Sequence, residues 1–176
     1  RIRNDVCRIG EIDPRAFSPS WAATLAASMV SRVSMGVQTF SPELQAAIGR
    51  HQPVELIEMC VESLRARGIG QINFDLLYGL PGQTIALLES TLDVVARLRP
   101  TRVALFGYAH VPSMFPRQKR IDISRLPDLR ERFDQAARGF ERLTAEGYIP
   151  VGFDHFALPD DPLGRAALAG RVRRSF

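Results

Sequence analysis

Charged and amide side chains stand at or near the ends of several predicted strands, where they could bind a small polar molecule. Glu11 lies at the end of the first β-branched run, Gln38 follows the second, and Asp75 lies within the third. Ligands of parallel α/β proteins bind at the carboxyl ends of the strands, so these groups would meet at one rim. Ala109 and His110 follow the fourth run. The pattern predicts a site for a polar small molecule, since carboxylates accept and amides both donate and accept hydrogen bonds.

Several residues at this rim also have a purely structural interpretation. Asp13 is best explained as the N-cap of the following turn, and Gln38 could form hydrogen bonds with the backbone of a loop. Arg50 comes directly after Gly49 and could offset the negative end of a helix. Asp75 is the hardest to explain in this way, because it lies in an otherwise apolar strand and carboxylates are seldom buried without a partner.

The elements that must position these residues alternate between strands and helices along the chain. We expect strands over 6–12, 32–37, 71–78, 101–107 and 148–152. We expect a helix from Pro19, one helix over 41–68 and further helices over 84–98 and 128–145, with an irregular loop over 108–126. Such alternation predicts βαβ units and a parallel sheet. The strands lack polar alternation, as 103–106 shows, which is typical where helices cover one face and a barrel interior the other.

Composition excludes several classes of protein. The chain has 176 residues, of which 45% are hydrophobic and 24% charged, so it resembles one globular domain. The net charge of +4 comes almost wholly from scattered arginines without interleaved aromatics, so we expect no nucleic-acid partner. No apolar run approaches about 18 residues, so we expect no membrane partner. Cys7 and Cys60 lack a disulfide or metal spacing and lie in apolar runs, which predicts buried thiols and a cytoplasmic protein.

Five segments closely resemble the oxygen-independent coproporphyrinogen III oxidase family, the coproporphyrinogen dehydrogenases of the radical S-adenosylmethionine (SAM) superfamily. The resemblance runs in register over nearly the whole chain. The segments are residues 11–15 (Glu-Ile-Asp-Pro-Arg), 34–38 (Ser-Met-Gly-Val-Gln), 75–81 (Asp-Leu-Leu-Tyr-Gly-Leu-Pro), 108–112 (Tyr-Ala-His-Val-Pro) and 154–161 (Asp-His-Phe-Ala-Leu-Pro-Asp-Asp). The last two are the most specific to the oxidase.

The resemblance implies a fold and a set of cofactors. The fold is α/β: a partial (β/α)6 radical-SAM barrel of the TIM-like kind, from its third to its last strand, over residues 1–152. Residues 153–176 would begin the segment that leads to a carboxy-terminal domain. The cofactors are a [4Fe–4S] cluster and two SAM molecules. Glu11 and Ala109 match positions that contact the cluster-bound SAM, whereas Gln38, Arg50 and Asp75 match positions that contact the second SAM.

The implied reaction is the oxidative decarboxylation of two propionates of coproporphyrinogen III to vinyl groups, giving protoporphyrinogen IX in anaerobic haem biosynthesis. This oxidoreductase chemistry also needs an electron donor and an electron acceptor. Two alternatives remain. One is a haem chaperone of the same superfamily, which residues 108–112 and 154–161 disfavour. The other is a non-catalytic α/β module that binds SAM.

One departure from the family pattern concerns the cluster. The family holds it with a C-x-x-x-C-x-x-C motif on the first barrel loop, and Cys7 and Cys60 match neither its spacing nor its position. We therefore expect no metal ligands and no identifiable catalytic residue in this chain, and no turnover by the chain alone. The chain starts at Arg1 and stops at Phe176, as if cut from a longer barrel. Open sheet edges would then favour an edge-mediated dimer.

Overall fold

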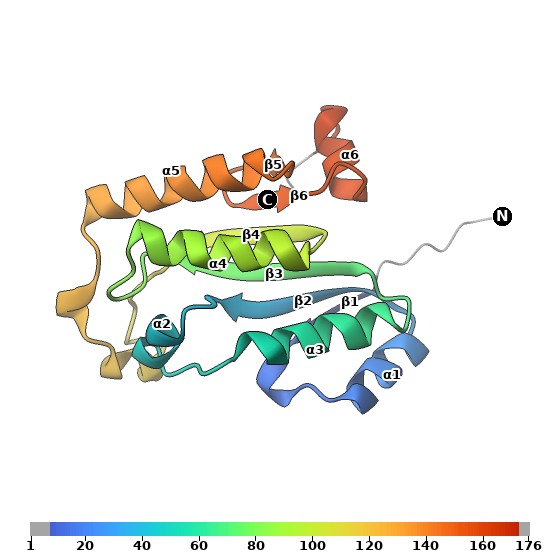
Figure 1. Ribbon diagram of the computed structural model, residues 1–176, viewed down its shortest axis with the longest axis horizontal. Helices are drawn as coiled ribbons and strands as arrows, with labels where there is room; N and C mark the ends of the chain where they lie inside the picture. The colour runs from blue at the N-terminus through green and yellow to red at the C-terminus, as the bar shows by residue number, and fades with distance from the viewer. Residues whose placement is uncertain (1–7, 173–176) are drawn as a thin grey trace.

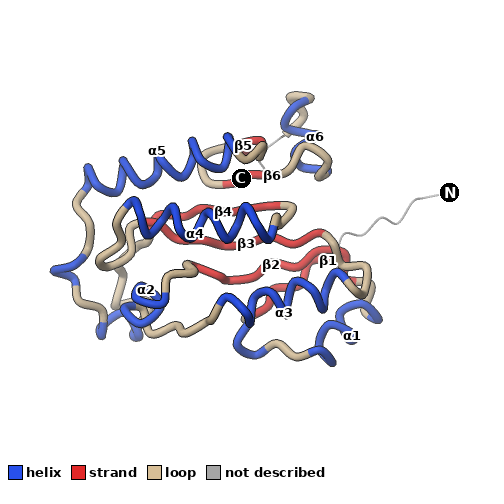
Figure 2. Tube along the Cα trace, in the orientation of Figure 1, coloured by secondary structure: helices blue, strands red, loops and turns tan. Residues whose placement is uncertain are grey.

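A six-stranded sheet with helices along one face forms the body of the molecule (Figures 1 and 2). The structure is a computed structural model and describes residues 8–172. The strands are β1 (Arg8–Ile12), β2 (Val30–Gln38), β3 (Gln71–Tyr78), β4 (Arg102–Gly107), β5 (Ile149–Val151) and β6 (His155–Ala157). The helices are α1 (Pro19–Ala27), α2 (Pro42–Ala47), α3 (Val54–Arg65), α4 (Ile85–Leu98), α5 (Leu129–Ala145) and α6 (Pro162–Leu168). Short 3-10 helices are η1 (Pro14–Ala16), η2 (Pro116–Arg120) and η3 (Ile123–Arg125).

The strand order is β1-β2-β3-β4-β6-β5, and the first four strands are parallel, as the alternating pattern predicted. The prediction of a wholly parallel sheet is wrong beyond β4. Strand β6 was not predicted, and it runs antiparallel to both β4 and β5. The reason is that β5 and β6 form a hairpin, and its second strand rather than its first pairs with β4. Strands β1 and β5 are the edges of this sheet, so the described residues form an open barrel segment.

Local capping signals account for most helix starts. Ser18, Ser41 and Thr84 each accept a hydrogen bond from a backbone amide in the first turn of the helix that follows. Asp128 and Glu131 form a reciprocal capping box at the start of α5. The structure confirms the helices predicted from Pro19, over 84–98 and over 128–145, each to within one residue of its start. It also confirms the strand predicted over 71–78.

The single helix predicted over 41–68 is wrong, because the structure has two helices there, α2 and α3. Gly49 adopts a left-handed backbone conformation with φ of 64°, and Pro53, which lacks a backbone N–H, is the N-cap of α3 and makes no side-chain capping hydrogen bond. Gly49 and Pro53 mark this break in the sequence, and residues 49–53 carry no apolar side chain other than that of Pro53. The intervening segment carries Arg50 and Gln52 back to the end of β2.

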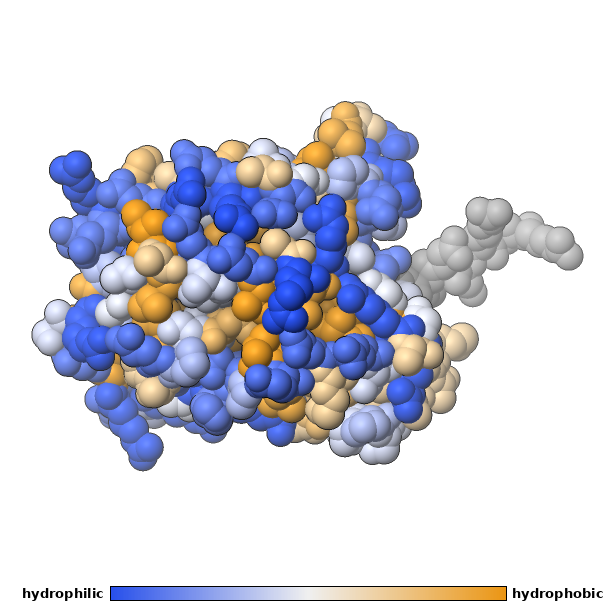
Figure 3. Space-filling model, viewed as in Figure 1, coloured by the Kyte–Doolittle hydropathy of each residue, from blue (hydrophilic) through white to orange (hydrophobic). Residues whose placement is uncertain are grey.

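The main core lies between the sheet and its helices. Outward residues of β2, β3 and β4 are buried under α3, α4 and α5, and they include Val33, Met35, Ile72, Phe74, Leu76, Val103 and Leu105. Ion pairs from Arg138 to Glu89 and from Arg142 to Asp93 tie α5 to α4 on the outside. In the view of Figure 3, hydrophilic residues make up most of the surface, with apolar residues between them. None of the helices in the described part is long and apolar enough to span a membrane.

The segment over 108–126 was predicted as an irregular loop, but it contains η2 and η3. A small second core lies under it, made of the buried side chains of Leu44, Leu80 and Tyr108. Tyr108 also donates its backbone N–H to the carbonyl of Tyr78 over 2.8 Å. The long connection after β4 is therefore anchored against α2 and the end of β3.

Candidate functional site

The inner face of the sheet, opposite the helices, carries a polar surface. Along β2 and β3 the burial alternates, with apolar side chains fully buried under the helices and polar ones half-exposed on the other face. The half-exposed inner residues are Arg32, Ser34, Gly36, Gln38, Gln71, Asn73 and Asp75. The prediction that the strands lack polar alternation is therefore wrong for β2 and β3, although it holds for the buried run in β4. The period-two pattern in 32–38 and 71–75 was the sequence signal for this surface.

Asp75 lies at the centre of a hydrogen-bonded group on this surface. Ser34 Oγ donates to Asp75 Oδ2 over 2.8 Å, and Asn73 Nδ2 donates to Asp75 Oδ1 over 2.8 Å. Asn73 Nδ2 also donates to Ser34 Oγ over 2.9 Å. Both donors to the carboxylate are neutral, and each carboxylate oxygen has a second lone pair that can accept from a ligand. Ser34 and Asn73 are positioning residues that the sequence reasoning missed.

Gln38 and Arg50 converge over Gly36, the residue paired with Asp75 in the neighbouring strand. A Cβ atom on Gly36 would lie 3.0 Å from Gln38 Nε2 and 3.2 Å from Arg50 Nη2. The amide of Gln38 and the guanidinium of Arg50 therefore lie beside Gly36, and the carboxylate of Asp75 is at the paired position of the neighbouring strand. We refer to Gly36, Gln38, Arg50 and Asp75 together as the cradle. Three of the five residues predicted to contact SAM therefore come together.

The carboxyl end of β2 is shaped by side chains from the α2–α3 segment. The register shifts between Gly36 and Gln38, and Gln38 has a left-handed φ of 67°. Arg50 Nη2 donates to the carbonyl of Gly36 over 3.0 Å, and Gln52 Nε2 donates to the carbonyl of Val37 over 2.8 Å. Buried Gln45 in turn holds the backbone of Gln52 on both sides. Arg50 thus binds a strand end, and the alternative that it offsets a helix terminus is wrong.

Glu11 and Asp13 lie at the end of β1, next to the cradle. Glu11 is paired with Ser34 across the strands, so it shares the inner face, and its side chain is exposed. Asp13 caps η1, as predicted, and it forms ion pairs with Arg15 at 2.6 Å and with Arg50 at 3.3 Å. The hydrogen bonds from Arg15 lower the pKa of Asp13 from 3.8 to about 2. Burial lowers the pKa of Arg50 from its usual value, against the attraction of Asp13.

Ala109 lies apart from the cradle, in the connection after β4. It is exposed, and its carbonyl accepts a hydrogen bond of 2.9 Å from Gln118 Nε2. The next residue, His110, shares a hydrogen bond of 3.0 Å between its Nδ1 and the hydroxyl of buried Tyr108. The backbone at Ala109 lies at the same end of the sheet, but among the described residues no hydrogen bond joins it to Glu11, Gln38, Arg50 or Asp75. Gln118 is a positioning residue that the sequence reasoning missed.

The donor set for an iron–sulfur cluster is not found among residues 8–172, where no three His, Cys, Asp or Glu side chains cluster as metal ligands. Cys60 is buried in α3, and burial raises its pKa to about 11, so it favours the thiol over the thiolate that binds metal. The predicted position of Cys7 in an apolar environment lies outside the described residues. The cradle by contrast fits the polar groups of SAM, because it offers a carboxylate acceptor, an amide and a cation at neighbouring positions on the inner face.

At the opposite end of the sheet, a buried ion pair joins the start of β4 to the chain beyond β6. Arg102 donates to Asp161 Oδ1 from Nε over 2.9 Å and from Nη2 over 2.7 Å, and the Asp161 side chain is 1% exposed. Asp161 also caps α6 by accepting from the amide of Leu163 over 2.7 Å. This pair holds β6 and α6 onto the parallel strands. Asp161 belongs to the family-like segment 154–161, but no sequence pattern indicated its pairing with Arg102.

Comparison with known proteins agrees with this geometry. Residues 7–95 match the sequence profile described as the Radical SAM superfamily. The chain is 45% identical over 166 residues to an oxygen-independent coproporphyrinogen III oxidase of Cereibacter sphaeroides, covering 94% of this chain and 37% of that protein. It is 42% identical to the oxidase of the same name in Pseudomonas aeruginosa, covering 94% of this chain and 36% of that protein. The chain therefore spans just over a third of the length of these relatives.

Among solved structures, coproporphyrinogen III oxidase from Escherichia coli, described as a radical SAM enzyme, superposes with a TM-score of 0.89 at 38% identity. The superposition covers 95% of this chain and 38% of that one. An archaeal Elp3 from Methanocaldococcus infernus superposes with a TM-score of 0.65 at 17% identity, which reflects the fold alone.

Proposed function

Because the chain belongs to the radical SAM superfamily, we propose that it is the SAM-binding part of an oxygen-independent coproporphyrinogen III oxidase. The observation that carries the proposal is the convergence of Gln38, Arg50 and Asp75 around Gly36. The relatives in Cereibacter sphaeroides and Pseudomonas aeruginosa are named as coproporphyrinogen III oxidases, which supports coproporphyrinogen III as the substrate. Since the chain spans just over a third of those relatives, the activity is proposed for a protein that contains this chain together with cluster ligands.

Each cradle residue has a role that follows from its chemistry. Asp75 is the acceptor for ribose hydroxyls or for the methionyl amine, because its own donors are neutral and leave lone pairs free. Arg50 pairs with the methionyl carboxylate, and Gln38 adds an amide contact. Glu11 and Ala109 contact another SAM molecule, the one bound to the cluster. Because Gly36 has no side chain, the side chains of Gln38 and Arg50 can lie directly against the strand backbone at this position.

The chain supplies binding and orientation rather than redox chemistry. SAM bound with a [4Fe–4S] cluster supplies the one-electron chemistry that starts oxidative decarboxylation of a propionate. Among the described residues no set of side chains is grouped as ligands for that cluster. What the cradle contributes is a fixed geometry, because Gln52 and Gln45 lock the end of β2 before a ligand arrives. Coproporphyrinogen III, two SAM molecules, an electron donor and an electron acceptor complete the proposed reaction in the cytoplasm.

The test is an anaerobic assay of the whole protein that contains this chain, with coproporphyrinogen III, SAM and a chemical reductant. Formation of protoporphyrinogen IX with SAM consumption is the expected result. Haem binding without decarboxylation would support the haem-chaperone alternative instead. SAM binding without any turnover would favour the non-catalytic SAM-binding module, and a complete lack of SAM binding in calorimetry would overturn the proposal.

A further inference from the structure

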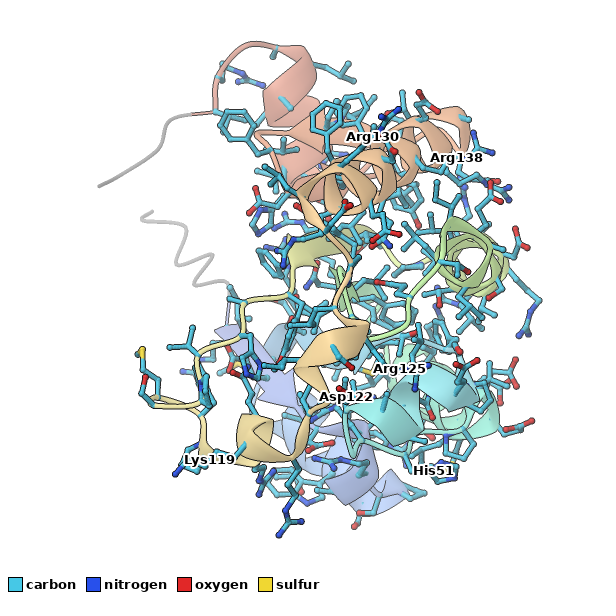
Figure 4. All side chains as sticks on the ribbon, turned by 90° about the vertical axis from the view of Figure 1, so that its left-hand side faces the viewer. His51, Lys119, Asp122, Arg125, Arg130 and Arg138 are labelled. Atoms are coloured by element: carbon cyan, nitrogen blue, oxygen red, sulfur yellow. The ribbon has the colours of Figure 1, made fainter. Side chains whose placement is uncertain are left out.

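A basic groove lies between the end of α2 and η2, beside the cradle. It has a volume of about 690 Å³. Three arginines line it, Arg15, Arg117 and Arg120, and its apolar lining includes Ile48 and Ile121. Figure 4 looks at this end of the molecule, with Lys119 on η2 and Asp122 on the segment that follows. Neither the five residues predicted to contact SAM nor the ion pairs of the fold use Arg117 or Arg120.

The groove has an excess of positive charge. Arg15 is paired with Asp13, but Arg117 and Arg120 form no ion pair with any carboxylate of residues 8–172. The positive charges of Arg15 and Arg117 also act against the protonated form of Arg50 and contribute to lowering its pKa, although burial is the larger cause. Cations that repel one another at one place are stabilised by an anionic ligand. The charge pattern therefore indicates that an anion binds here.

The residues that line the groove indicate which chemical class of anion it would bind. Guanidinium groups bind carboxylates and phosphates through paired hydrogen bonds. Apolar residues between the arginines, as at Ile48 and Ile121, favour a ligand with a hydrocarbon body rather than a free inorganic ion. A propionate arm on a pyrrole ring has both parts, a methylene chain attached to a flat apolar ring and a terminal carboxylate.

We propose that Arg117 and Arg120 bind a propionate of the tetrapyrrole substrate, one that anchors the ring while another propionate reacts. This proposal rests on the proposed function, because it names the substrate contacts of the same site. The groove adjoins the cradle, since Gly49 lines the groove and Arg50 follows it in the chain. A ring anchored in the groove would therefore lie beside bound SAM.

The test uses this chain and coproporphyrin III, the stable oxidised tetracarboxylate, with binding measured by fluorescence quenching. The double variant Arg117→Gln/Arg120→Gln should weaken binding about tenfold, because two exposed charge contacts are lost. Lys119→Gln is the matched control, since it removes a cation from the same 3-10 helix but outside the groove lining, and it should leave the dissociation constant unchanged. Circular dichroism checks that each variant is folded.

A second measurement does not depend on any variant. The tetramethyl ester of coproporphyrin keeps the ring and removes the charges, so it should bind far more weakly than the acid to the unaltered chain. Equal binding of acid and ester, or equal binding by the double variant and the unaltered chain, would overturn the groove proposal. Calorimetry with SAM separates this result from the proposed function: a chain that binds SAM but shows no arginine dependence for coproporphyrin loses only the groove proposal.

Discussion

Ser34 Oγ and Asp75 Oδ2 are joined by a 2.8 Å hydrogen bond between adjacent parallel strands, on the face that no helix covers. The bond fixes one carboxylate oxygen while leaving the group exposed to a ligand. It also connects the strand that carries Gln38 to the strand that carries Asp75. Because the bond joins two rigid strands, the carboxylate is held in place without a charged partner.

Replacing Asp75 with Asn should weaken SAM binding about tenfold or more, because a charge-assisted acceptor for hydroxyl or ammonium groups is lost. Ser34→Ala should have a smaller effect, since it frees the carboxylate without removing it. Calorimetry with SAM measures both. Asp93→Asn, the same change on the outer helix α4, is the control and should bind SAM normally. Normal binding by the Asp75 variant would contradict its assigned role.

Gly36→Ala should abolish most SAM binding while the fold is retained. The added methyl group would lie 3.0 Å from Gln38 Nε2 and 3.2 Å from Arg50 Nη2, so it would displace both side chains from the cradle. Gly70→Ala is the matched control, because a Cβ there meets no atom within 4 Å. Thermal melting should show both variants folded, and calorimetry should separate them. If both variants bind SAM equally, the placement of Gln38 and Arg50 over Gly36 is not part of the site.

Asp161→Ala should destabilise the protein by about 3–5 kcal/mol, because it leaves the largely buried Arg102 without its partner. The same substitution at Asp93 breaks the more exposed pair with Arg142 and should cost less than about 1 kcal/mol. Urea denaturation gives both free energies of unfolding. Similar losses in the two variants would show that burial does not distinguish these pairs.

Lowering the pH should reduce the free energy of unfolding, in part because Asp13 becomes protonated. Its pKa is about 2 in the folded protein and 3.8 as the reference value, so the folded state favours the charged form. The resulting stabilisation is complete above about pH 5 and is lost as the pH falls through 3.8 towards 2. In Asp13→Asn, the free energy of unfolding should therefore be lower than in the unaltered protein at pH 6, and the two should converge near pH 2. A difference that stays constant over this range would contradict the assignment.

Local signals in the sequence account for the parts of the fold that are set within a few residues. Ser18, Thr84 and Asp128 each start a helix by accepting a neighbouring amide, and such caps can be found by inspection. The pairing of β6 with β4 could not be found in this way, because it joins residues about fifty positions apart and depends on a hairpin docking against an existing strand.

The residues of the candidate site differ in how far the sequence alone could identify them. Asp75 stood out as the only carboxylate among the residues of β3, although the strand proved to alternate between polar and apolar side chains. The meeting of Gln38 with Arg50 was implied only by the family resemblance, because the turn at Gly49 brings Arg50 back to the end of β2, and no local pattern predicts such a contact. Arg117 and Arg120 had no distinguishing sequence pattern, since arginines are scattered along the chain.

The ion pair of Arg102 with Asp161 also affects how the chain folds as it is made. Its partners are 59 residues apart, so at about 5–20 residues per second a ribosome needs roughly 3–12 seconds to supply the aspartate after the arginine. During that interval the outer edge of β4 lacks β6 and presents unpaired backbone groups. The nascent protein is therefore most open to mispairing with other chains just before synthesis of the β5–β6 hairpin.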